Sequence, residues 1–197
     1  MDGRRGLLGA VRLAAVGLAA ALLTGCGGAE RPEPSEPKQS QPPRAERRIT
    51  QPEEAGGLVR SRFVDDVYNL GEPAPGQSFL AALYRAPGVD PDDILEHTVV
   101  LATDAAPGRS EERRLHLVKE IDPVGDFAAA AKAVDPGPLG GRTDCGWTQT
   151  PEAGMVLCSW SDESTAGVIA FSGAAAADTD FTEVGRTFTA MREDIVR

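Results

Sequence analysis

The sequence predicts an α+β domain, in which an antiparallel sheet includes a C-terminal three-stranded meander over 141–173 and two helices pack on one face. Two strand-like segments share the pattern Cys-x-Trp, beginning at Cys145 and Cys158. Apolar residues recur at alternating spacings of three and four between Phe181 and Ile195, which is the period of an amphipathic helix. Two bounded apolar runs, at 78–86 and 97–103, are typical of strands buried on both faces.

The first 25 residues have the pattern of an export signal. Three arginines precede an uninterrupted apolar run, Leu13–Leu23, and small residues follow it. The order Leu23-Thr24-Gly25-Cys26 resembles the lipobox of bacterial lipoproteins, and the resemblance implies a lipid on Cys26 and cleavage before it. An uncleaved membrane helix and a plain secretory peptide are the alternatives. The helix would have to bury Arg12, since a span needs about 20 residues.

Residues 26–57 are expected to form the lipidated cysteine and a disordered tether. The segment 27–57 contains six prolines and no aromatic residue, so it cannot bury enough apolar surface to fold. Proline favours extended backbone and makes such a linker semi-rigid. Every aromatic residue lies after position 60, which places a single globular, extracytoplasmic domain at 58–197.

The charge of the chain limits its partners. The net charge is −10, and residues 58–197 carry 12 basic against 23 acidic side chains. Such a domain lacks the basic surface of nucleic-acid-binding proteins. We expect the membrane to be reached through the lipid anchor, and any partner at the cell envelope to be a cation, a basic protein or a neutral ligand. The acidity also has a simpler interpretation, which is solubility.

The elements before the meander are predicted from local patterns. Residues 114–121 alternate between apolar and polar side chains and are expected to form a strand. Asp90-Pro91 and Asp122-Pro123 each place a capping side chain before a proline, the usual start of a helix. The second pair is expected to open a helix near 123–134, and the first a turn or two.

The final helix is predicted near 179–196. Asp180 and Glu183 have the spacing of a capping box at its start. Its apolar stripe should pack on the sheet, and it consists of Phe181, Val184, Phe188, Met191 and Ile195.

The meander predicts a disulfide. Strands at 141–149, 155–162 and 166–173, with a four-residue loop at 150–153, place Cys145 directly opposite Cys158. Opposed residues of an antiparallel pair lie within disulfide range, and an exported protein can oxidise them. A zinc site or a redox dithiol is the weaker alternative. Strand alternation places Trp147 and Trp160 on one face, either as an interaction patch or as core.

A resemblance covers roughly the last 60 residues. The cysteine pair, the run Cys158-Ser159-Trp160-Ser161-Asp162, Gly167-Val168 and a closing helix with Arg192 are similar to a group of actinobacterial membrane-anchored extracytoplasmic domains. The resemblance implies topology and location outside the cytoplasm, on the cell membrane. It implies no chemistry.

No motif predicts a catalytic residue, a cofactor or a metal. His97 and His116 are the only histidines and lack the spacing of metal ligands. Asp90, Asp92 and Asp93 suit helix capping better than calcium, because their spacing is not that of a calcium loop. Two function classes remain: a non-catalytic binding or accessory module, which the sequence favours, and a small cell-envelope enzyme whose site is assembled from scattered residues.

Overall fold

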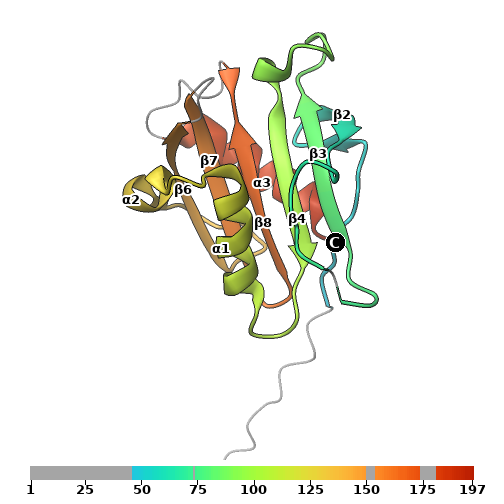
Figure 1. The fold of residues 1–197 in the computed structure, drawn as a ribbon, viewed down its shortest axis with the longest axis vertical. Coiled ribbons are helices and arrows are strands. Elements are labelled where there is room, and N and C mark those ends of the chain that lie inside the picture. Colours follow the sequence, from blue (N-terminus) through green and yellow to red (C-terminus); the bar gives the residue numbers. More distant parts are fainter. Residues whose placement is uncertain (1–45, 73, 150–153, 174–180) are drawn as a thin grey trace, which may run out of the picture. The chain divides into compact units, whose positions relative to one another are not determined.

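The computed structural model describes residues 46–72, 74–149, 154–173 and 181–197. In this part the strands and helices follow one another along the chain as Figure 1 shows. They are β1 (Glu54–Ala55), β2 (Leu58–Phe63), β3 (Phe79–Arg85), the 3-10 turn η1 (Ile94–Glu96), β4 (Thr98–Asp104), α1 (Ser110–Ile121), α2 (Asp126–Ala130), β5 (Lys132–Ala133), β6 (Arg142–Gln149), β7 (Gly154–Ser161), β8 (Thr165–Phe171) and α3 (Thr182–Ile195).

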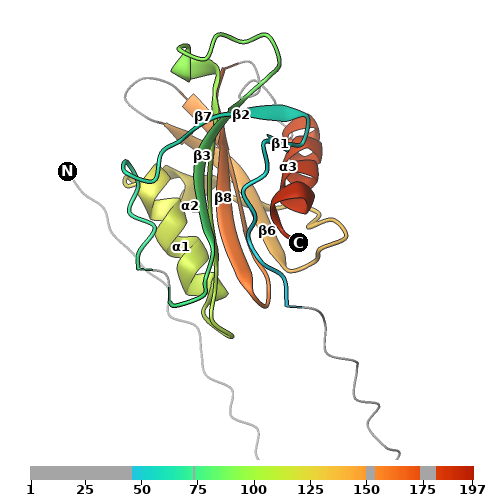
Figure 2. The same cartoon turned by 90° about the vertical axis from the view of Figure 1, so that its right-hand side faces the viewer.

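The eight described strands form one open sheet in the order β1-β2-β3-β4-β8-β7-β6-β5. Every described pair of neighbours is antiparallel. The described domain has three layers, with α1 and α2 on one face of the sheet and α3 on the other (Figure 2). The predicted α+β class and antiparallel sheet are confirmed.

The expectation that the helices near 123–134 and 179–196 cover the same face is wrong. Phe127 of α2 packs with α1 in one apolar cluster, whereas Phe188 of α3 lies in the cluster on the opposite face. The central strands explain the difference: every residue of β8 is buried, and all but the first of β7. Strands that are apolar on both sides need a cover on both sides.

Residues 110–121 form helix α1, not the strand predicted at 114–121. The residues that α1 buries are Arg114, Leu117, Val118 and Ile121, which recur with the period of a helix. Leu115, which strand alternation would bury beside Leu117, is 54% exposed. The buried stripe contains an arginine, so a search for apolar residues alone does not find it.

The second helix is shorter than predicted. It begins at Asp126 with Gly125 as its N-cap, so the Asp122-Pro123 pair does not open it as predicted. The Asp122 carboxylate instead accepts hydrogen bonds from the backbone N–H groups of Gly125 and Phe127 in the connection that follows α1. The helix α2 ends at Ala130, because Lys132 and Ala133 leave it to pair with β6 as β5. Backbone pairing with the edge of the sheet overrides the helix preference of the alanine run.

The fold begins earlier than the expected tether boundary at residue 57. Ile49 is only 3% exposed, and it forms an isolated antiparallel bridge with Val196 at the other end of the chain. The backbone N–H of Arg48 donates to the carbonyl of Arg197 at 2.7 Å, and that of Arg197 donates back at 3.0 Å. Residues 46–57 therefore belong to the folded domain.

The last three strands, β6, β7 and β8, pair in sequence order. Cys145 lies opposite Cys158, as the spacing predicted, and the two form a disulfide with 4.1 Å between their Cα atoms. The loop predicted at 150–153 lies outside the described residues. Gly167 lies opposite Trp160, and a side chain at this glycine would collide with the indole ring.

The stripe predicted for the last helix is confirmed. Four of its residues lie in α3, the fifth directly before it, and all five are buried: Phe181, Val184, Phe188, Met191 and Ile195. They meet Trp160 and other side chains of β7 and β8 across the interface, and the Phe188 ring lies edge-on to Trp160 with 5.9 Å between ring centroids.

Candidate functional site

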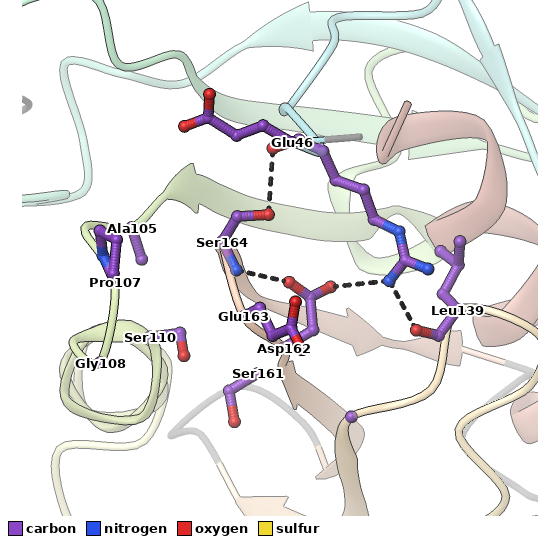
Figure 3. Close-up of a pocket in the computed structure, with 12 residues that line it drawn as sticks. Glu46, Ala105, Pro107, Gly108, Ser110, Leu139, Ser161, Asp162, Glu163 and Ser164 are labelled. Atoms are coloured by element: carbon purple, nitrogen blue, oxygen red, sulfur yellow. Dashed lines mark hydrogen bonds and ion pairs between the residues drawn. The ribbon is translucent and has the colours of Figure 1, made fainter. Parts of the chain in front are cut away.

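A cavity of about 780 Å³ opens at one end of the sheet. Three connections meet there: the turn between β7 and β8, the loop from β4 into α1, and the loop before β6 (Figure 3). The first described residues, Glu46 and Arg47, form part of its wall. A well-formed cavity where several connections converge is where a catalytic or ligand-binding site is most expected.

Asp162 lies in the wall of this cavity and is fully engaged by hydrogen bonds. One carboxylate oxygen accepts the backbone N–H groups of Ser164 and Thr165, at 3.0 and 2.9 Å. The other accepts the Thr165 hydroxyl at 2.8 Å and Nη2 of Arg192 at 3.0 Å. Arg47 adds a longer ion pair at 3.8 Å (Figure 3). A carboxylate has about four acceptor positions, and here each has a donor.

These contacts set the protonation state of Asp162. Burial alone would raise the pKa of its carboxyl group, but the bonds from Ser164, Thr165 and Arg192 outweigh burial. The pKa therefore lies below its ordinary value of 3.8, and the group is ionised at neutral pH. An acid this strong is a poor proton donor or acceptor near pH 7.

Arg192 is the buried partner of Asp162, and its side chain is only 1% exposed. Its Nη1 donates to the carbonyl of Pro136 at 3.1 Å, and its guanidinium lies 5.8 Å from the centroid of the Trp160 ring. Burial lowers the pKa of Arg192, and the attraction of Asp162 offsets only part of that effect. The arginine stays protonated, so the pair fixes α3 against the β7–β8 turn at some cost in desolvation.

A second charged cluster lies on the α1 face of the same strands. The buried Arg114 donates to Glu111 at 2.7 Å and to the hydroxyl of Ser159 at 2.8 Å, and it forms an ion pair with Asp144 at 3.4 Å. The hydroxyl of Ser161 donates to Glu111 at 2.8 Å. The bond from Arg114 is the main reason why the pKa of Glu111 falls to about 2.

The two clusters give a physical role to the residues from which the resemblance was predicted. In the run from Cys158 to Asp162, alternate side chains serve opposite faces of the sheet. Ser159 and Ser161 bond to α1-face groups, whereas Trp160 packs under α3. Gly167 leaves room for the indole, and Arg192 closes the ion pair with Asp162. Together these residues join both helical layers to one strand.

The predicted interaction patch is not an exposed surface. Trp160 is 0% exposed, since α3 covers it, and only Trp147, on the same face, is partly exposed. Cys145 and Cys158 are both buried and bonded to each other. Cys26 lies outside the described residues.

The two histidines contact backbone carbonyls. A ring nitrogen of His97, which is 1% exposed, lies 2.6 Å from the carbonyl oxygen of Asp93. A ring nitrogen of His116 lies 2.7 Å from the carbonyl oxygen of Asn69. Across the described ranges, His, Cys, Asp and Glu form no group of three or more that could hold a metal ion. Within the same ranges, each helix is too short or too polar to cross a bilayer.

The charged groups of the cavity thus have a structural use. Asp162 and Arg192 connect α3 to the β7–β8 turn, and Arg47 connects the N-terminal segment to the same carboxylate. The groups of the cavity that lie on its exposed side are the carboxylates of Glu46 and Glu163. This arrangement can attract a polar ligand, but its most constrained carboxylate is held in one protonation state.

Comparisons of the chain with protein-family models, with curated proteins and with solved structures found no match. The resemblance to lipoproteins and to actinobacterial extracytoplasmic domains therefore stays a prediction.

Proposed function

We propose that this protein is a lipid-anchored domain on the extracytoplasmic face of the cell membrane, where it acts by binding and not by catalysis. The observation that carries the proposal is the hydrogen bonding and ionisation of the Asp162 carboxylate. The carboxylate lies in the wall of the cavity of about 780 Å³, it has a donor at each acceptor position, and its pKa is lowered. Such a group supports a rigid scaffold better than it supports proton transfer.

The proposed location is supported by all three cysteines. Cys26 follows the apolar run in the order of a lipobox. Cys145 and Cys158 form a buried disulfide, and structural disulfides persist in oxidising compartments. A lipid anchor with two or more chains holds a protein stably, whereas a single chain gives only reversible binding.

The anchor is tested by metabolic labelling with an alkyne-bearing fatty acid. We expect wild-type protein and the matched variant Gly28→Ala to incorporate label and to partition into detergent. Cys26→Ala should incorporate none and should accumulate as the uncleaved precursor. Normal processing and membrane retention of Cys26→Ala would show that the anchor is not a lipid on this cysteine.

The non-catalytic assignment is tested with the purified domain on cell-wall fragments and peptides. We expect no saturable turnover. Turnover that is lost in Glu163→Gln or Ser110→Ala, two cavity residues whose substitution should leave the fold intact, would instead establish the alternative, a small cell-envelope enzyme.

A further inference from the structure

The segment 86–97, here called the β3–β4 loop, lies at the end of the sheet opposite the cavity. It enters β4 at Thr98, which pairs with Phe171, whereas the cavity adjoins the other end of the same pair, Asp104 and Thr165. Seven residues of β4 separate the two ends by about 20 Å, at roughly 3.3 Å per residue. Figures 1 and 2 show the loop with η1 at the far end from the point where the described chain begins.

The β3–β4 loop is held in one conformation. The backbone N–H of Glu96 donates to the carbonyl of Asp93 at 3.1 Å, and the buried ring of His97 lies 2.6 Å from the same oxygen. The guanidinium of Arg85, the last residue of β3, donates to the carbonyl of Val89 at 2.8 Å. A rigid loop loses little conformational entropy when a partner binds it.

This ordered loop presents two adjacent aliphatic side chains to solvent. Ile94 is 56% exposed and Leu95 is 51% exposed, although the central strands of the fold bury nearly all of their apolar residues. Single exposed aliphatics are common on protein surfaces. Here the two exposed residues are consecutive in η1, so the tip of one loop carries two aliphatic side chains, which we call the apolar knob.

The knob shares its loop with carboxylates that form no ion pair in the described structure; Arg85 bonds to a backbone carbonyl of the loop and not to one of them. The loop contains four carboxylates and no lysine or arginine. None of the four forms an ion pair with another described residue, and they are Asp90, Asp92, Asp93 and Glu96. At the cavity end, by contrast, Asp162, Asp144 and Glu111 each pair with arginines.

We infer that the β3–β4 loop is the docking surface for a protein partner that presents an apolar pocket framed by lysine or arginine. The inference rests on the proposed binding function and names the chemistry of its partner. The carboxylates speed encounter with a basic surface, and the aliphatic pair supplies the buried contact. A lipid surface does not fit, because anionic headgroups repel four unpaired carboxylates. The loop also lies at the end of the sheet remote from residue 46.

The test uses the full-length protein in its own cells, with a photo-reactive benzophenone amino acid at position 95. Matched controls carry the same amino acid at Val124, which is 77% exposed, and at Glu163, an exposed residue at the cavity end of the sheet. We expect a discrete protein adduct from position 95 only, and the peptide joined to it should carry a net positive charge. The double variant Asp92→Asn, Asp93→Asn should reduce the adduct about fivefold, since it removes two of the four attracting charges. Unchanged melting temperature shows that the variant is folded.

Each other outcome is informative. Equal adducts at positions 95 and 124, an adduct with lipid, or an acidic contact peptide would overturn the docking surface. A protein adduct from position 124 or 163 and none from 95 would overturn it as well, while the proposed binding function would stand. Absence of protein adducts from all three positions would contradict both.

Discussion

Replacing Asp162 by asparagine should destabilise the domain by about 3 kcal/mol. The change leaves the Arg192 guanidinium, whose side chain is 1% exposed, without the anion 3.0 Å away. Removing one member of a buried pair costs roughly 3–5 kcal/mol, because the other charge stays desolvated. Asparagine still offers one oxygen to the N–H of Ser164, which favours the lower end of that range.

Urea unfolding of the purified domain measures this difference. At a slope of roughly 2 kcal/mol per molar urea, the midpoint should fall by about 1.5 M. The matched control is Glu163→Gln, the neighbouring and exposed carboxylate on the same turn, which should shift the midpoint by about 0.2 M or less. Adding Arg192→Met to Asp162→Asn should recover part of the loss, because it removes the unpaired charge.

The effect should also depend on pH in a defined direction. The pKa of Asp162 is lower in the folded protein than its ordinary value of 3.8, so its contribution is present above that pH. It is lost as pH falls through the folded pKa, and the difference between wild type and Asp162→Asn should shrink in strong acid. A midpoint for Asp162→Asn that equals that of Glu163→Gln at pH 7 would refute the role assigned to the buried pair.

Three other measurements address the remaining parts of the fold. Phe188→Ala should cost about 3–5 kcal/mol, because its ring is 0% exposed against Trp160; a loss below about 1 kcal/mol would contradict the packing of α3. The pKa of Glu111 is about 2 in the folded protein, so wild type should lose more stability than Glu111→Gln as pH falls from 4.5 towards 2. If the free energy of unfolding of the two proteins changes in parallel with pH, the bond from Arg114 is contradicted. Cys145 and Cys158 should resist alkylation in exported protein until a reductant and a denaturant are added, and labelling of the native, untreated protein would exclude the disulfide.

Features that depend on local geometry could be predicted from the sequence. The register of Cys145 with Cys158 follows from counting residues across a short hairpin, and the stripe of α3 follows from the helical period. The burial of Trp160 does not follow from the sequence in the same way, because alternation gives the face of a strand but not what covers that face.

Features that depend on tertiary contacts could not be predicted in the same way. The pattern of α1 suggests a strand because its buried stripe contains Arg114, whose charge is compensated by Glu111 one helical turn earlier and by Asp144 of β6. The central strands are apolar on both faces, so each face needs a helix to cover it. The sequence of a single strand does not show which helix covers which face, and the side on which α3 packs could not be predicted. The Asp162–Arg192 pair joins residues 30 positions apart, and no spacing rule links them.

The bridge between Ile49 and Val196 has a mechanical consequence. The first described residues run along the sheet beside the last ones (Figure 2), and backbone hydrogen bonds join Arg48 to Arg197 in both directions and Thr50 to Ile195. A pull applied to the chain ahead of Glu46 acts along this segment, so it loads those bonds together with the bond from Ile49 to Asp104. Bonds sheared together resist force far better than bonds opened one after another. The two ends of the domain are thus joined by these hydrogen bonds. If the domain is held at its N-terminal side and a partner pulls on it, the sheet stays folded until these bonds break.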